Sequence, residues 1–168
     1  MKNHLLIIIS ILLFWQCSIS YKFTGASIDY NKVKTMSVSR FPNEAPLVAD
    51  PALSQEFTEG LKDFFMKQTR LDLVQNNGDL QFEGEITDYD ISPMSIQADL
   101  LAAQTRVTLK VKVRFINTSD SEQDFEKEFS AYVDFESTQN FETIKDQLRE
   151  ELLEQIFDNI FNESVANW

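Results

Sequence analysis

Strict alternation of apolar and polar residues predicts three consecutive strands in the second half of the chain. The predicted ranges are 79–92, 105–116 and 124–135. In the middle range the apolar residues are Val107, Leu109, Val111, Val113 and Phe115. A period of two with one polar face is typical of a sheet that packs one face on a core and leaves the other in water. A fourth strand is predicted over 33–41.

Apolar residues at helical spacing predict two amphipathic helices. The first begins at Pro51, a residue suited to the first helical position, after a predicted N-cap at Asp50, and ends near Gln68. The second extends from Phe141 to Phe161 and carries acidic residues on its other face. Two helices with one apolar face each, and a sheet that buries one face, predict an α+β fold. We expect a two-layer sandwich, with both helices packed on one face of a four-stranded, mostly antiparallel sheet.

The first sixteen residues have the layout of an export signal. Lys2 gives a short positive region, and an apolar run of eleven residues extends from Leu5 to Trp15. As a helix, at about 1.5 Å per residue, this run reaches only about half of a ~30 Å hydrocarbon core. We therefore predict a signal peptide over 1–16, an N-terminal segment over 17–32, and a single domain over 33–168.

The only cysteine, Cys17, directly follows the predicted signal. In an oxidising compartment a lone cysteine forms an intermolecular disulfide, stays a free thiol or is modified. Its position resembles a bacterial lipobox, whose cysteine is acylated and becomes the first mature residue, although Phe14, Trp15 and Gln16 differ from the usual Leu and small residues. We predict lipid attachment at Cys17, which would hold the protein on a membrane without a spanning helix. The alternative is cleavage nearby with Cys17 unmodified.

The charge balance of the mature chain is strongly acidic. Removal of residues 1–16 takes away one lysine and no acid, which changes the net charge from −12 to −13. Such a charge opposes nonspecific binding to nucleic acid or to an anionic membrane surface. We therefore expect no nucleic-acid partner.

The sequence lacks the residues and motifs on which common enzyme classes depend. His4 is the only histidine and lies in the predicted signal, which leaves the mature chain no imidazole base or ligand. The four glycines form no phosphate-binding loop, and the carboxylates recur at the spacing of solvated faces. We predict a protein that is not an enzyme and that needs no cofactor or metal.

A basic stripe lies on the polar face of the middle strand. Its cationic members are Arg106, Lys110, Lys112 and Arg114. Such a stripe could receive the phosphates of an anionic lipid.

Pairing with neighbouring strands offers a second explanation of the stripe. A hairpin closed through 117–122 keeps both apolar faces together if paired residue numbers sum to 238 or 240. The expected neighbours on the next strand are Asp124 or Glu126 for Arg114, Glu126 or Glu128 for Lys112, and Tyr132 or Asp134 for Arg106. Glu83 and Glu85 could flank the other side. We favour cross-strand ion pairing over a ligand site.

Seven segments, in order along the chain, together resemble one known family. They are "YKFTGASI" (21–28), "RFPNEAPLV" (40–48), "LSQEFTEGLKDFF" (53–65), "QTRLDLV" (68–74), "GDLQFEGEITDYDISP" (78–93), "LKVKVRFIN" (109–117) and "IFNESVANW" (160–168). The chain resembles the LptE family of lipopolysaccharide-assembly lipoproteins over nearly all of its mature length.

The resemblance implies a lipoprotein anchored in the outer membrane and facing the periplasm. Its body would plug the barrel protein LptD, and the two would move lipopolysaccharide to the cell surface. Direct contact with lipopolysaccharide is implied as well, and the basic stripe contains the candidate residues. The family fold of two helices on a four-stranded sheet agrees with the pattern above. The alternative is a periplasmic lipoprotein adaptor of another outer-membrane machine, either a secretin or a barrel-insertion complex.

Overall fold

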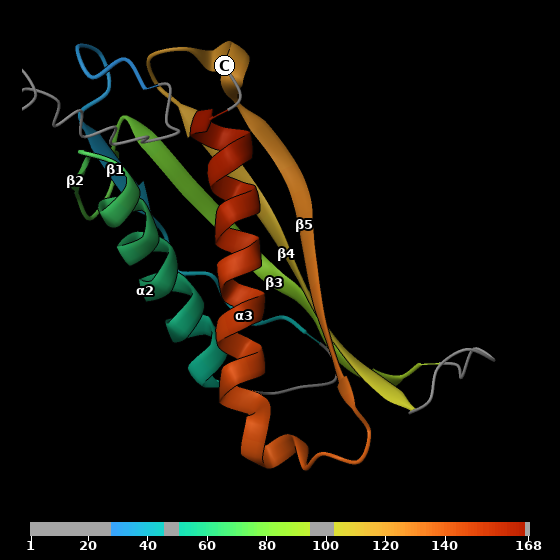
Figure 1. The fold of residues 1–168 in the computed structure, drawn as a ribbon. Helices are drawn as coiled ribbons and strands as arrows, with labels where there is room; N and C mark the ends of the chain where they lie inside the picture. Colours follow the sequence, from blue (N-terminus) through green and yellow to red (C-terminus); the bar gives the residue numbers. More distant parts are fainter. Residues whose placement is uncertain (1–27, 46–50, 95–102, 167–168) are drawn as a thin grey trace, which may run out of the picture.

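The computed structural model describes residues 28–45, 51–94 and 103–166. Figure 1 shows two helices side by side on one face of a twisted sheet, which confirms the predicted two-layer α+β architecture. The predicted signal peptide, Cys17 and the predicted N-cap Asp50 lie outside the described residues.

The sheet has five strands in the order β2-β1-β3-β4-β5. The strands are β1 (Thr35–Val38), β2 (Asp72–Leu73), β3 (Leu80–Pro93), β4 (Gln104–Asn117) and β5 (Phe125–Glu136). The pairs β3–β4 and β4–β5 are antiparallel, whereas β1 is parallel to both β2 and β3. The prediction of four mostly antiparallel strands is therefore wrong in strand number, and the sheet is mixed rather than mostly antiparallel. The helix between β1 and β2 returns the chain to the same end of the sheet, and β2 is too short to show alternation.

The segment between β2 and β3 crosses β1, because β1 lies between those two strands in the sheet. A Cβ atom at Gly78 would lie 2.5 Å from the carbonyl carbon of Met36, so the crossing requires glycine. The carboxylate of Asp79 accepts hydrogen bonds from the backbone N–H groups of Lys34 (2.8 Å) and Thr35 (2.9 Å). The bond from Lys34 contributes most to lowering the pKa of Asp79. These contacts attach the crossing segment to β1.

The helices are α2 (Pro51–Gln68) and α3 (Phe141–Phe161), and both bounds agree with the prediction. Asn140 caps α3 by accepting a hydrogen bond from the backbone N–H of Glu142 (3.0 Å). The two helices run in the same direction (Figure 1). Phenylalanine rings join them, with 5.2 Å between the ring centroids of Phe57 and Phe157 and 5.4 Å between those of Phe65 and Phe161. The core therefore lies between this helical layer and the sheet.

The inner face of the sheet is built on β4. All five of its predicted apolar residues are fully buried. In β3 a bulge lies between Ile86 and Asp88. The extra residue at the bulge reverses which residues face the core. Before the bulge the even-numbered Ile86 is buried, and beyond it the odd-numbered Tyr89 is buried. The bulge therefore turns Asp88 toward the outer face.

Candidate functional site

The basic stripe lies on the outer face of β4, opposite the core. The observed register gives paired residue numbers that sum to 240, so Arg114 faces Glu126 and Arg106 faces Asp134. This confirms one of the two predicted registers. On the other side of β4, Glu83 is the register partner of Arg114, as expected. Acidic strands therefore flank the stripe on both sides.

Arg106 is held in place by two residues of β5. Its Nε and Nη2 atoms donate hydrogen bonds to the two carboxylate oxygens of Asp134, at 2.7 and 2.8 Å. Its Cζ atom also lies 3.7 Å from the ring centroid of Tyr132. The hydrogen bonds raise the pKa of Arg106 and lower the pKa of Asp134. Two of the five N–H donors of the guanidinium are used in this way, and its charge is already paired with a carboxylate, so a phosphate would have to compete with Asp134.

The two lysines of the stripe also form ion pairs. Lys110 Nζ lies 3.1 Å from Asp88 Oδ2, and this hydrogen bond raises the pKa of Lys110. Lys112 pairs diagonally with Glu126, which raises the pKa of Lys112 and lowers that of Glu126. Its direct register partner, Glu128, instead accepts a hydrogen bond from the Thr87 hydroxyl (3.1 Å). We call these three ion pairs of Arg106, Lys110 and Lys112 the ion-pair ladder.

Arg114 differs from the other three cations. Within the part of the chain that the structure describes, it makes no ion pair, although Glu83 and Glu126 are its register partners. It is exposed near the end of β4. Of the four candidate residues, Arg114 is the one whose charge is least committed to a neighbour.

The sequence pattern did not reveal one carboxylate of the ladder, Asp88, and it offered a further contact, Tyr132, only in the other register. Asp88 reaches the outer face only because of the bulge in β3, and strict alternation would have placed it inside. Tyr132 was expected beside Arg106 only in the alternative register, yet its ring contacts the guanidinium along the strand. No signal in the sequence marks the position of a bulge, so the outward position of Asp88 could not have been predicted.

The ladder joins β4 to its two neighbouring strands through paired charges. In residues 28–45, 51–94 and 103–166 no group of three or more His, Cys, Asp or Glu side chains could hold a metal ion. In the same residues no helix is both long and apolar enough to cross a membrane.

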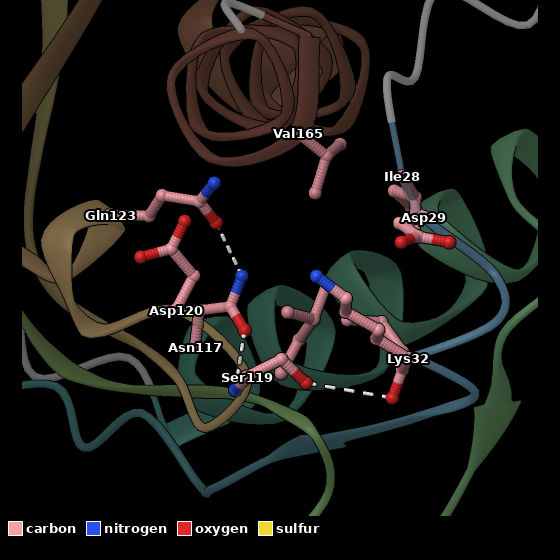
Figure 2. Close-up of a pocket in the computed structure, with 10 residues that line it drawn as sticks. Ile28, Asp29, Lys32, Asn117, Ser119, Asp120, Gln123 and Val165 are labelled. Carbon is pink, nitrogen blue, oxygen red and sulfur yellow. Dashed lines mark hydrogen bonds between the residues drawn. The ribbon is translucent and has the colours of Figure 1, made fainter.

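A pocket of about 310 Å³ lies at the end of the sheet where the N-terminal segment enters (Figure 2). The buried side chain of Asn117 donates a hydrogen bond to Gln123 Oε1 and accepts one from the backbone N–H of Ser119 (2.9 Å). The Ser119 hydroxyl donates to the backbone carbonyl of Lys32 (3.5 Å). These bonds tie the β4–β5 connection together and attach it to the N-terminal segment. The sequence analysis did not anticipate this pocket.

Comparison with known proteins identifies the family. The model of the LptE family, described as lipopolysaccharide-assembly, matches residues 33–164. The chain belongs to the LptE family. The match spans both helices and all five strands, and LptE proteins are non-enzymatic lipoproteins that assemble lipopolysaccharide at the outer membrane. No curated protein matches this chain.

Solved structures support the same fold at low sequence identity. A hypothetical protein from Chlamydia trachomatis aligns with a TM-score of 0.53 at 12% identity, over 80% of this chain and 99% of that one. A protein from Xanthomonas campestris gives 0.52 at 12% identity, over 77% and 82%. A minor lipoprotein from Acinetobacter baumannii gives 0.51 at 12% identity, over 78% and 91%. These similarities establish the fold alone.

Proposed function

We propose that this chain is the lipid-anchored partner of an LptD-like barrel, which it plugs and helps to assemble for lipopolysaccharide transport to the cell surface. The observation that carries the proposal is the family match over residues 33–164. In this proposal Cys17 carries the lipid, and the domain faces the periplasm from the outer membrane. The chain acts as a structural partner and catalyses no reaction.

The ion-pair ladder supports a role as plug rather than as the main lipid-binding element. Three of the four cations of the stripe are paired with acidic residues of neighbouring strands. A phosphate would have to compete with carboxylates that are already in place, on a mature chain of net charge −13. If the outer face contacts lipopolysaccharide, Arg114 is the residue that we expect to do so, because it makes no ion pair among the described residues.

Depletion of the chain in its native cell tests this function. We expect newly made lipopolysaccharide to disappear from the cell surface and the LptD-like barrel to lose its mature form, while unrelated outer-membrane barrels assemble normally. Loss of all barrels together would instead indicate a barrel-insertion adaptor. Loss of a secretin with normal surface lipopolysaccharide would indicate a secretin adaptor. Either of these two results would contradict the proposal.

A further inference from the structure

A solvent-facing groove of about 470 Å³ runs between α2 and α3. Its floor consists of Gly60, Phe64, Leu153 and Phe157. A Cβ atom at Gly60 would lie 2.9 Å from the ring of Phe157, so glycine at this position leaves room for that ring beneath the groove. The apolar side chains of this floor offer no hydrogen-bonding group to a bound molecule.

Acidic residues line both sides of the groove. The carboxylates are those of Glu56, Asp63, Asp146, Glu150 and Glu154, and the cations are Lys67 and Arg149. Arg149 pairs with Glu56 across the two helices, at 2.9 Å. Among the described residues, no ion pair involves Asp63, Glu150 or Glu154. The field over the apolar floor is therefore negative, which favours cationic occupants and disfavours anionic lipids.

The length of the groove fits about three helical turns. On α3 the lining residues recur at helical spacing from Asp146 to Phe157, which corresponds to about 16 Å along the axis. An extended peptide over this floor would leave backbone polar groups facing apolar side chains, whereas a helix satisfies its own backbone. The geometry therefore favours a helical occupant.

We propose that this groove binds an amphipathic helix of a partner protein, with an apolar row flanked by lysine or arginine on both sides. The apolar row contacts Phe64, Leu153 and Phe157, and the flanking cations face Asp63 on α2 and Glu150 and Glu154 on α3. The groove is formed by the helical layer, whereas the ion-pair ladder lies on the opposite face of the sheet. The inference is argued from the lining of the groove and not from the family match, so it does not depend on the proposed barrel partnership.

A synthetic helical peptide tests the proposal on the full mature chain. The probe is an 18-residue peptide with one row of leucines flanked by lysines. One control peptide has serine in place of the leucines, and the other has glutamate in place of the lysines. We expect each control peptide to bind at least about tenfold more weakly than the probe, because recognition needs both the row and the charge. Equal binding of the serine peptide would overturn the proposal.

Two double variants locate the binding site. We expect Asp63→Lys with Glu154→Lys to weaken probe binding by at least about tenfold, while a matched pair of charge reversals at exposed sites, Glu122→Lys with Glu136→Lys, changes it little. In the NMR spectrum of the wild-type chain, the probe should shift the amide signals of Gly60, Leu153 and their neighbours. Equal weakening by the two double variants, amide shifts confined to the strands, or absence of binding would each overturn the proposal.

Discussion

Arg106 and Asp134 join β4 to β5 through two hydrogen bonds, of 2.7 and 2.8 Å. The pair is partly shielded, since the two side chains are 32% and 26% exposed, and the ring of Tyr132 lies against the guanidinium. In the observed register, in which paired residue numbers sum to 240, the two residues lie directly opposite each other. The pair therefore favours this register between β4 and β5.

The Asp134 carboxylate should make stability depend on pH. Hydrogen bonds from Arg106 lower its pKa below the ordinary value of 3.8. A carboxylate with a lowered pKa stabilises the fold above its ordinary value, and this contribution is lost as the pH falls through the folded-state pKa. We expect Asp134→Asn to lower the free energy of unfolding at neutral pH and the difference from wild type to shrink below pH 3.8. Urea denaturation across a pH series measures this.

A matched variant separates this pair from general charge effects. Asp158→Asn removes an exposed carboxylate on α3 that forms no ion pair among the described residues. We expect it to leave stability nearly unchanged at every pH. If Asp134→Asn loses the same amount of stability at low and at neutral pH, the pair does not stabilise the fold through its charge.

Substitution of the exposed stripe should affect stability slightly and lipid capture little. We expect the triple change of Lys110, Lys112 and Arg114 to Gln to lower the melting temperature modestly, because exposed ion pairs contribute little. Capture of lipopolysaccharide by the purified domain should persist, and Arg114→Gln alone should show whether the uncommitted cation takes part. Capture that disappears in the triple variant, and that weakens steeply in wild type as added salt shortens the screening length toward about 8 Å, would place the lipid site on this face.

Regular elements were predictable from the sequence because alternation and helical spacing report burial directly. Both helices and the inner face of β4 were found in this way. The two-residue strand β2 was not, since Asp72 and Leu73 are both exposed and show no pattern. The parallel direction of β1 was also missed, because the sequence around Gly78 does not reveal that the chain crosses a strand there. Asp88 was missed since one bulge reverses the side of every residue that follows.

The close approach of the chain to β1 at Gly78 can be tested by adding one methyl group at this position. Gly78→Ala would place a Cβ atom 2.5 Å from backbone atoms of β1, which cannot move aside as a side chain can. We expect a loss of about 1–3 kcal/mol in the free energy of unfolding, typical of overpacking. Gly60→Ala is the milder comparison, because its Cβ would lie 2.9 Å from the Phe157 ring, a side chain that can shift, and alanine favours the helix by about 0.5–1 kcal/mol; we expect a smaller loss than at Gly78. Equal stability of Gly78→Ala and wild type would show that the crossing is looser than described.

The proposed lipid anchor predicts a change of location without a change of fold. We expect Cys17→Ser, produced in large excess over the proposed barrel partner, to be released from the membrane into the soluble periplasmic fraction, because a lipid on Cys17 is the proposed attachment and the excess protein has no barrel to hold it. The released protein should keep the melting temperature of the wild-type domain, since the domain begins near residue 33. Retention of the variant in the membrane fraction would contradict lipid attachment at this cysteine as the anchor.

The most direct test of the barrel partnership is the composition of the complex that this chain forms in its own membrane. The tagged chain would be extracted in mild detergent and purified, and the proteins that co-elute in stoichiometric amount would be identified by mass spectrometry. We predict one large β-barrel of the LptD type, present in a fixed ratio to this chain. A ring-forming secretin or the components of a barrel-insertion complex, recovered in place of that barrel, would contradict the account.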